Sequence, residues 1–194
     1  MLKGKEIIVG ITGSIAAYKA AELVRRLKEE EAGVSVIMTE KATRFITPLT
    51  LETLSRSPVY CSLFPGEKKW DLPHISLAGK ADLILIAPAT ANLIGKLASG
   101  IADDLLTTVV MAADIPVVVA PAMNTRMYEN PILQSNLKKL KDVGYKTIEP
   151  EYGFLACDEK GKGRLADINT ILQVVKDVLK SQKKKVRRER KSKR

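Results

Sequence analysis

The chain has 194 residues, of which 45% are hydrophobic and 28% are charged, and this length suits one domain around one core. No apolar run approaches the roughly 20 residues that a membrane-spanning helix needs, so we expect no membrane protein. The formal net charge is +10, but the last fourteen residues contribute +8 of it, with nine Lys/Arg and one Glu. We therefore predict a nearly neutral domain at 1–180 and a basic, disordered tail at 181–194, and nucleic-acid binding is not favoured.

The two cysteines point to a reducing compartment. Cys61 and Cys157 lie far apart and belong to no CxxC or Cys/His pattern, which argues against a disulfide framework and a zinc site. The N-terminal apolar run is short and is not followed by a small-residue cleavage site, so we expect no signal peptide. These features predict a cytoplasmic location.

Strand and helix patterns alternate along the chain. The run EIIVGI at 6–11 is continuously apolar, as in a strand that is buried on both faces. Between Ile15 and Glu31 apolar residues recur every three or four positions, which predicts a helix. This alternation predicts a single α/β domain, a Rossmann-like (flavodoxin-like) doubly wound parallel sheet in a three-layer αβα arrangement. The other predicted elements are strands at 34–38, 81–90, 115–124 and 146–149, helices at 95–98, 103–113, 131–143 and 168–179, and short helices within 41–76.

The turn after the first strand is the first candidate site, because ligands of parallel sheets bind beyond the carboxyl ends of the strands. Gly13, Ser14 and Ile15 form a turn that resembles a phosphate-binding loop. The turn matches neither GxxxxGK[ST] nor GxGxxG, which weakens the case for ATP hydrolysis and for a standard NAD site. An ordinary turn in which Ser14 caps the next helix is the alternative.

Two later strands end in similar small, proline-containing loops. In the first loop, Thr90 and Asn92 can hydrogen-bond a ring edge or a phosphate, or they can simply cap the next helix. Pro88 predicts that the central ladder stops in this loop. The second loop ends in Asn124. Two such loops side by side suit a flat, largely apolar ligand with few polar contacts.

Two further residues are candidates for proton transfer. His74 is the only histidine, and imidazole exchanges protons near neutral pH; a structural or surface histidine is the alternative. Cys157 lies in a predicted Gly/Lys-rich loop whose positive charge would favour a reactive thiol. Many cysteines are simply small buried hydrophobic residues, so both interpretations stay open from composition alone.

Five segments together resemble the homo-oligomeric flavin-containing cysteine decarboxylase family, and within it the phosphopantothenoylcysteine decarboxylase branch. The resemblance covers about residues 5–180 and depends on the order and spacing of the segments. They are TGSIAAYKA (12–20), PHI around His74, APATANLIGKLASGIADDLLTT (87–108), APAMNTRMYENP (120–131) and LACDEKGKGR (155–164).

The resemblance implies that the cofactor is FMN. Most of the implied binding residues follow predicted strands, which agrees with the physical argument above. The implied cofactor-binding residues are Gly13, Ser14, Ile15, Thr39, Glu40, Lys41, Thr90, Ala91, Asn92, Leu93 and Ala122, and the implied substrate-binding residues are Asn124, Met127 and Lys160.

The resemblance also implies the reaction, which converts 4′-phosphopantothenoylcysteine to 4′-phosphopantetheine in coenzyme A biosynthesis. The cysteinyl group is oxidised to a thioaldehyde, CO2 leaves, and the enethiolate is reduced again. His74 is implied as the acid/base of the oxidation, Asn124 as the carboxylate anchor, and Cys157 as the proton donor of the last step. The family further implies an oligomer built from trimers with FMN near the subunit interface. A phosphopantothenate–cysteine ligase is an expected partner, because many relatives carry one as a second domain.

Two positions depart from the family pattern, and neither removes an implied catalytic group. Asp158 stands where many members have glycine, and Tyr128 stands where tryptophan is usual. Peptide-cysteine oxidative decarboxylases lack the reducing cysteine, so Cys157 favours the coenzyme A branch. A flavin-bearing regulatory subunit is a further alternative, against which the combination of His74, Asn124 and Cys157 argues for an enzyme.

Overall fold

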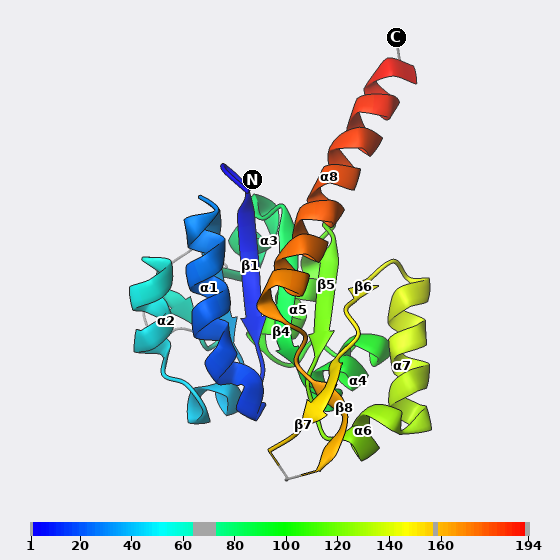
Figure 1. The fold of residues 1–194 in the computed structure, drawn as a ribbon. Coiled ribbons are helices and arrows are strands. Elements are labelled where there is room, and N and C mark those ends of the chain that lie inside the picture. The colour runs from blue at the N-terminus through cyan, green and yellow to red at the C-terminus, as the bar shows by residue number, and fades with distance from the viewer. Residues whose placement is uncertain (1, 64–72, 157–158, 193–194) are drawn as a thin grey trace.

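The middle layer of the molecule is a six-stranded parallel sheet that helices cover on both faces (Figure 1). The computed structural model describes residues 2–63, 73–156 and 159–192, without the side chains of 73 and 183–192. The sheet contains β1 (Glu6–Ile11), β2 (Gly33–Met38), β3 (Val59–Tyr60), β4 (Leu83–Ala89), β5 (Val117–Pro121) and β6 (Lys146–Thr147), and β7 (Glu151–Phe154) pairs with β8 (Lys160–Arg164) in a separate antiparallel hairpin.

The strand order is β3-β2-β1-β4-β5-β6, and all neighbouring strands are parallel. β1 therefore has β2 on one side and β4 on the other, and the connections wind in opposite directions from it. Such a topological switch point leaves a crevice beyond the carboxyl ends of the two central strands. The doubly wound α/β fold that the sequence predicts is confirmed.

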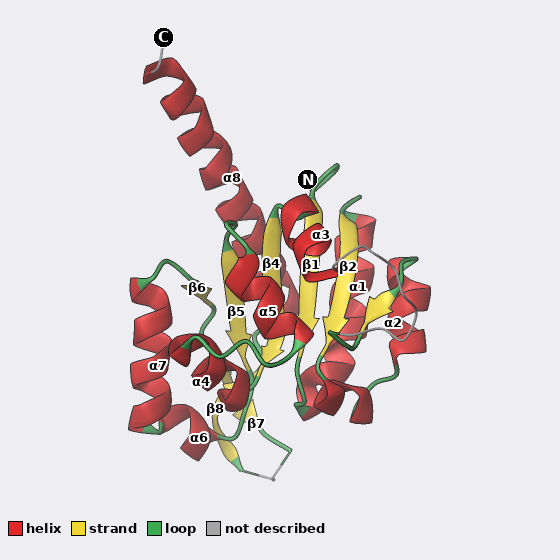
Figure 2. Cartoon of the chain, turned by 180° about the vertical axis from the view of Figure 1, so that it is seen from behind, coloured by secondary structure: helices red, strands yellow, loops and turns green. Residues whose placement is uncertain are grey.

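Helices pack on both faces because alternate residues of each buried strand point to opposite sides. Ile7 and Val9 belong to one core, and Ile8 between them belongs to the other. Figure 2 shows the second face from the front. The first face carries α1 (Lys19–Glu29), α2 (Pro48–Ser55) and α8 (Ile168–Ser192). The second face carries α3 (Pro73–Lys80), α4 (Ala91–Ser99), α5 (Leu105–Ala112) and α7 (Pro131–Asp142). The short helices η1 (Ile15–Tyr18), η2 (Glu40–Arg44) and α6 (Thr125–Glu129) follow β1, β2 and β5.

Gly10 in β1 allows α5 to lie directly on the sheet. A Cβ atom at this position would be 2.6 Å from Leu106 Cδ1, which is far inside van der Waals contact. The second face of the sheet is therefore packed tightly at its centre, next to the switch point.

Several elements differ from the sequence-based expectation. The predicted helix 15–31 begins with the 3₁₀ turn η1 and ends at Glu29, and the predicted helix 95–98 is part of the longer α4. The short β3 and α6 and the hairpin β7–β8 were not predicted. The Lys/Gly alternation of 160–164 has low strand propensity, so the predicted loop around Lys160 is instead a strand that depends on its pairing with β7.

The prediction that the ladder stops at Pro88 is wrong, because β4 runs through this residue to Ala89. The register between β4 and β5 shifts between Ile86 and Ala89 and then resumes at Pro121. Proline lacks only the N–H, and its carbonyl oxygen accepts the N–H of Thr12 at 3.3 Å. The shift of register between β4 and β5 thus accommodates the N–H group that Pro88 lacks.

The sequence predicts a disordered tail from residue 181, but the structure continues α8 to Ser192, and Figure 1 shows this end projecting from the domain. Ile171 and Val175 are fully buried and anchor the first part of the helix. Because propagation costs less than nucleation and Lys and Arg are good helix formers, the helix extends beyond its packed part. Within the described residues, no helix is long and apolar enough to cross a membrane.

Candidate functional site

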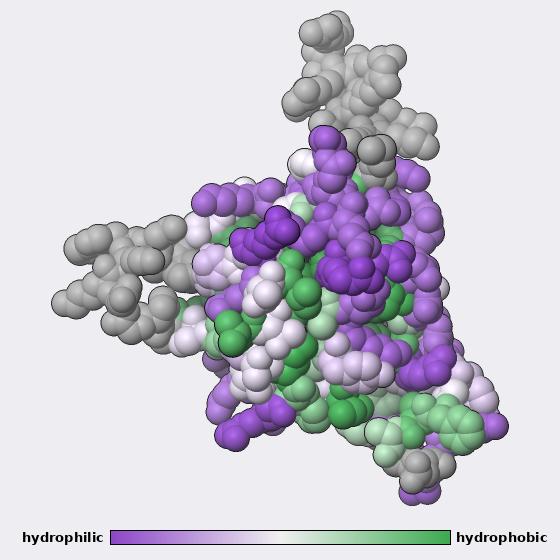
Figure 3. Space-filling view, turned by 60° about the vertical axis from the view of Figure 1, so that its left-hand side comes forward, coloured by the Kyte–Doolittle hydropathy of each residue, from purple (hydrophilic) through white to green (hydrophobic). Residues whose placement is uncertain are grey.

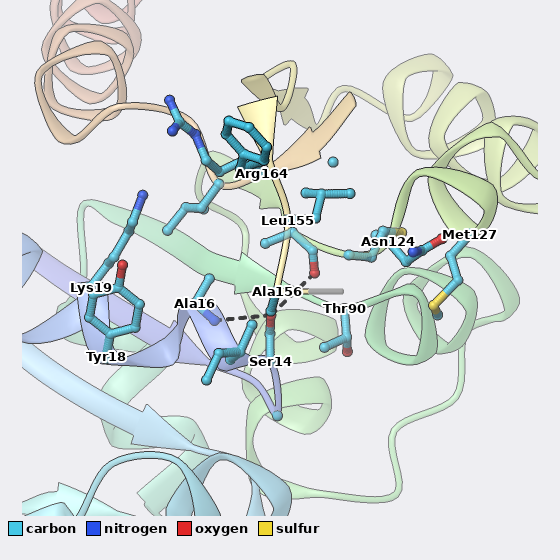
Figure 4. A pocket seen from close by; sticks show the side chains of 17 residues that line it. Ser14, Ala16, Tyr18, Lys19, Thr90, Asn124, Met127, Leu155, Ala156 and Arg164 are labelled. Carbon is cyan, nitrogen blue, oxygen red and sulfur yellow. Dashed lines mark hydrogen bonds between the residues drawn. The ribbon is translucent and has the colours of Figure 1, made fainter. Parts of the chain in front are cut away.

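A cavity of about 720 Å³ lies beyond the carboxyl ends of β1, β4 and β5, and the hairpin β7–β8 contributes to its wall (Figure 4). Most of the lining is apolar, with a few polar groups at the strand ends, which is typical of cofactor and small-molecule sites. The lining residues are Gly13, Ser14, Ile15, Ala16, Tyr18, Lys19, Thr90, Ala122, Met123, Asn124, Met127, Phe154, Leu155, Ala156, Gly163, Arg164 and Leu165.

Thr12 connects the ends of β1 and β4 beneath this cavity. Its hydroxyl donates to the Pro88 carbonyl oxygen at 2.7 Å and accepts the Thr90 N–H at 3.0 Å. Thr12 is buried, and a hydroxyl is the side-chain group that can donate and accept at once in so little space. The bridge fixes the position at which Thr90 enters the cavity and begins α4.

Ser14 connects the turn after β1 to the loop after β5. Its Oγ accepts the Ala16 N–H at 3.3 Å and donates to the Ala122 carbonyl oxygen at 3.4 Å, the two bonds that Figure 4 draws. The capping interpretation of Ser14 is therefore confirmed, and the same residue also lines the cavity. Thr12 and Ser14 together hold three strand ends in one rigid arrangement.

The segment after β2 packs against the glycine turn. A Cβ atom at Gly13 would be 2.5 Å from Lys41 Cβ, so only glycine allows this approach. The preceding Thr39 is at the N-cap of η2, but its side chain makes no capping bond. Its Oγ1 is buried and has no hydrogen-bond partner among the described residues. A buried hydroxyl without a partner is costly, which makes Thr39 a candidate ligand contact.

Asn124 begins α6 at the edge of the cavity. Its Oδ1 accepts the Arg126 N–H at 2.8 Å and caps the helix. Because the amide oxygen faces the helix, the amide N–H donors face away from it. Met127, one turn along α6, is half exposed and lines the same cavity.

The hairpin β7–β8 is attached to the Asn124 segment through glycines. Gly161 lies against Thr125, where a Cβ atom would be 2.0 Å from Thr125 Oγ1. The Met123 N–H donates to the Gly163 carbonyl oxygen at 2.9 Å. The position of the hairpin and the position of Asn124 are therefore coupled.

A polar cluster of Tyr128, Glu149 and Lys162 holds β8 against α6. The Tyr128 hydroxyl and the Lys162 ammonium both donate to Glu149 Oε2 at 2.8 Å. The bond from Lys162, and then that from Tyr128, lowers the pKa of the Glu149 carboxyl. Burial, and then the bond to Glu149, raises the pKa of Tyr128 to about 12. The carboxylate and the phenol therefore keep complementary protonation states over a wide pH range.

Of the three residues expected to take part in the chemistry, the structure places Asn124 at the cavity and His74 outside its lining. His74 is on α3, and it does not line the cavity; its Nδ1 is buried and has no partner among the described residues. Cys157 lies outside the described residues, but Leu155 and Ala156 just before it line the cavity. Lys160 lies outside the lining, with its ammonium 4.5 Å from the centroid of the Phe154 ring.

The predicted cofactor residues divide into two groups. Gly13, Ser14, Ile15, Thr90 and Ala122 line the cavity, whereas Thr39, Glu40, Lys41, Ala91, Asn92 and Leu93 do not. Leu93 in particular is packed in the core, so its side chain is not available to a ligand. Sequence reasoning also missed Tyr18, Lys19 and Arg164, all of which lie in or beside segments that it singled out for other residues.

The sequence of residues 1–180 matches the family model described as Flavoprotein. The chain belongs to the flavoprotein family. This flavoprotein is 48% identical over 177 residues to a "probable phosphopantothenoylcysteine decarboxylase" of Streptococcus mutans, covering 90% of this chain and 99% of that protein. It is also 48% identical over 174 residues to the coenzyme A biosynthesis bifunctional protein CoaBC of Bacillus subtilis, covering 90% of this chain but 43% of that protein. The chain thus spans nearly all of the first relative and less than half of the second.

Solved structures of similar proteins share the whole flavoprotein fold. A cysteine-to-serine variant of PPC decarboxylase, complexed with pantothenoylaminoethenethiol, is 32% identical with a TM-score of 0.83, covering 89% of this chain and 96% of that one. The FMN-binding protein AtHal3 is 32% identical with a TM-score of 0.81, covering 92% and 98%. The FMN-dependent cysteine decarboxylase SpaF is 29% identical with a TM-score of 0.76, covering 90% and 99%.

Proposed function

We propose that the chain is an FMN-dependent phosphopantothenoylcysteine decarboxylase, which converts 4′-phosphopantothenoylcysteine to 4′-phosphopantetheine and CO2. The observation that carries this function is the cavity at the switch point, where the polar strand ends, Asn124 and the residues preceding Cys157 meet. The relatives support the same substrate class, because the Streptococcus mutans protein of that name matches over almost its whole length.

The residues present fit a flavin mononucleotide. The cavity is large and mostly apolar, as a flat ring system requires. The glycine turn at Gly13 keeps the backbone open. The buried hydroxyl of Thr39, which has no hydrogen-bond partner in the described part of the chain, lies on the segment packed against this turn. We assign Gly13, Ser14, Thr39, Thr90 and Ala122 to cofactor binding. When bound, FMN supplies the two-electron chemistry that allows CO2 to leave from the cysteinyl group.

The side chains of this protein then bind the substrate and move protons. We assign the Asn124 amide N–H donors to the substrate carboxylate, a contact that a carboxylate side chain could not make. The Cys157 thiol donates the proton that the enethiolate carbon needs on its return to the saturated product. Met127 and Leu155 contribute apolar wall that keeps water from the reacting carbon.

We further propose an oligomer built from trimers, in which the cavity lies near a subunit interface and a neighbouring subunit supplies His74. Two observations support it. His74 does not line the cavity of its own chain. Large apolar side chains are exposed on the segments that follow β1 and β2, and Figure 3 shows apolar patches among charged surface in the middle and lower part of this side of the molecule. These side chains are Ile15 (56% exposed), Tyr18 (60%), Phe45 (46%) and Leu49 (70%).

The experiment that tests this function uses the purified full chain. We expect a yellow protein whose flavin is FMN by mass, and which forms 4′-phosphopantetheine without added NAD(P)H. A colourless preparation that also stays inactive with added FMN would disprove the proposal. Turnover of a C-terminal cysteine peptide to its oxidised enethiol, with no activity on the phosphopantothenoyl substrate, would instead favour the peptide-cysteine oxidative decarboxylases.

A regulatory flavoprotein without activity is the second alternative. It would bind FMN and a partner protein but would leave the substrate unchanged.

We also infer a cytoplasmic location and a functional link to a phosphopantothenate–cysteine ligase. The ligase link rests on the family resemblance, and the Bacillus subtilis relative, of which this chain spans 43%, is named as a bifunctional protein.

A further inference from the structure

One side of the cavity carries two cationic side chains to which no role in the proposed reaction has been assigned. Lys19, the first residue of α1, and Arg164, the last residue of β8, both line it. In Figure 4 these two side chains are on one side of the cavity, and Asn124 and Met127 are on the opposite side. An elongated ligand can therefore contact the amide with one end and the cations with the other.

The two cations differ in how well they are neutralised. Arg164 Nη2 donates to Glu151 Oε2 at 2.6 Å, so a carboxylate already balances its charge. Among the residues that the structure describes, no carboxylate forms an ion pair with Lys19. Lys19 is only partly exposed. The ammonium group of Lys19 can therefore bind an anionic group of a ligand in the cavity.

The lysines of β8, to which the substrate phosphate could otherwise be assigned, are directed elsewhere. Lys160 lies over the Phe154 ring, and Lys162 is bound to Glu149. Neither lysine lines the cavity. Of the basic residues of β8, only Arg164, which is paired with Glu151, can therefore contact a ligand in the cavity.

We propose that Lys19, supported by Arg164, binds the terminal phosphate monoester of the substrate, so that the enzyme holds its substrate at both charged ends. The proposal rests on the proposed function. An ammonium is a good point-charge partner for a phosphate dianion. The substrate carries its carboxylate at the cysteinyl end and its phosphate at the other end, which matches the arrangement of Asn124 and Lys19 on opposite sides.

The cofactor also carries a phosphate monoester, so the test must separate the two sources. The probes are pantetheine and 4′-phosphopantetheine as inhibitors of full-length, flavin-loaded enzyme, because they differ only in the phosphate. The variants are Lys19→Met and Lys19→Gln, which remove the charge, and Lys19→Arg, which keeps it. Lys28→Met removes a cation from the last turn of the same helix and serves as the matched control.

We expect the ratio of the two inhibition constants to fall about tenfold in Lys19→Met and Lys19→Gln, which is what the loss of one charge-assisted contact predicts. Lys19→Arg and Lys28→Met keep the wild-type ratio. The FMN absorbance per chain stays unchanged in all four variants. The use of a ratio removes any general effect on folding or on the pantetheine part of the site.

Two results would overturn the proposal while the wild type still forms 4′-phosphopantetheine. An unchanged ratio in both neutral variants would show that Lys19 does not contact the substrate phosphate. Loss of FMN with an unchanged ratio would assign Lys19 to the phosphate of the cofactor. A wild-type enzyme that binds FMN but does not form 4′-phosphopantetheine would refute the proposed function itself, and this inference with it.

Discussion

The backbones of Gly163 and Met123 touch: a Cβ atom at residue 163 would be 2.1 Å from the Met123 carbonyl oxygen. The contact attaches the hairpin that precedes and follows Cys157 to the loop that presents Asn124. One backbone contact thereby couples the position of β8 to the position of the Asn124 segment.

Gly163→Ala is expected to displace the hairpin. Because the blocking atom belongs to the backbone, it cannot move aside cheaply, and we expect a destabilisation of about 1–3 kcal/mol, or about 5 °C in Tm. Differential scanning calorimetry and the decarboxylation rate provide the measurements. Gly79→Ala on α3 is the control, since a Cβ there meets nothing within 4 Å and alanine favours a helix. Equal Tm changes in both variants would contradict the steric argument.

Thr12→Val is expected to weaken the link between β1 and β4. The change leaves the Pro88 carbonyl oxygen and the Thr90 N–H without their hydroxyl partner, at a cost of about 1–3 kcal/mol in unfolding free energy. Chemical denaturation and the FMN content after gel filtration measure the effect. Thr12→Ser keeps the hydroxyl and should retain most of the wild-type stability and most of the FMN content. If Thr12→Ser is less stable than Thr12→Val, packing of the methyl group matters more than the hydrogen bonds.

Glu149→Gln is expected to remove a pH-dependent part of the stability. The pKa of Glu149 is lowered in the folded protein by Lys162 first, so its contribution is present above the ordinary carboxyl pKa of about 4.3 and is lost as the pH falls through the lower folded value. The Tm difference between wild type and variant should thus be constant near neutral pH and should shrink in acid. Glu129→Gln, which removes an exposed carboxylate on α6, should show no such trend.

Cys157→Ser is expected to stop the reaction after CO2 release, because a serine hydroxyl is a much weaker acid than a thiol. Mass spectrometry of the products should find the oxidised enethiol in place of 4′-phosphopantetheine. Cys61→Ser, at an exposed cysteine on the chain, should behave like wild type. Normal product at the normal rate from the Cys157 variant would show that another group donates the proton.

Deletion of residues 181–194 is expected to leave activity and Tm unchanged. Among the side chains that the structure describes, Leu179, at 5% exposed, is the last buried one of α8, and the helix beyond it projects from the domain (Figure 1). Enzyme kinetics and calorimetry on the shortened chain provide the measurement. A drop in activity would mean that the basic end of α8 takes part in assembly or in substrate capture.

The sheet was predictable because its strands are buried on both faces. A continuous apolar run such as Ile7–Ile11 has few alternatives once Gly and a capping residue follow it. The hairpin β7–β8 was not predictable in this way, because Gly161 and Gly163 have low strand propensity and are required by contacts with Thr125 and Met123. Such contacts join segments about forty residues apart, and a local pattern does not encode them.

The site was only partly predictable for a related reason. Residues that end strands, such as Ser14, Thr90 and Asn124, could be found because a parallel sheet brings its strand ends together. Lys19 could not, because a lysine on an amphipathic helix normally faces solvent. His74 carries an obvious chemical signal, yet its separation from the cavity depends on the packing of α3.

Glycine and basic residues alternate along β8, so the two faces of the strand have different side-chain requirements. Gly161 and Gly163 point toward the Asn124 segment, where any side chain collides. Lys160, Lys162 and Arg164 occupy the alternate positions, where side-chain length and charge are free of that limit. Of these three positions only Arg164 lines the cavity, whereas Lys162 helps to hold β8 against α6 through Glu149. A substitution at residue 164 can therefore change the charge that a ligand meets while both glycine contacts stay in place.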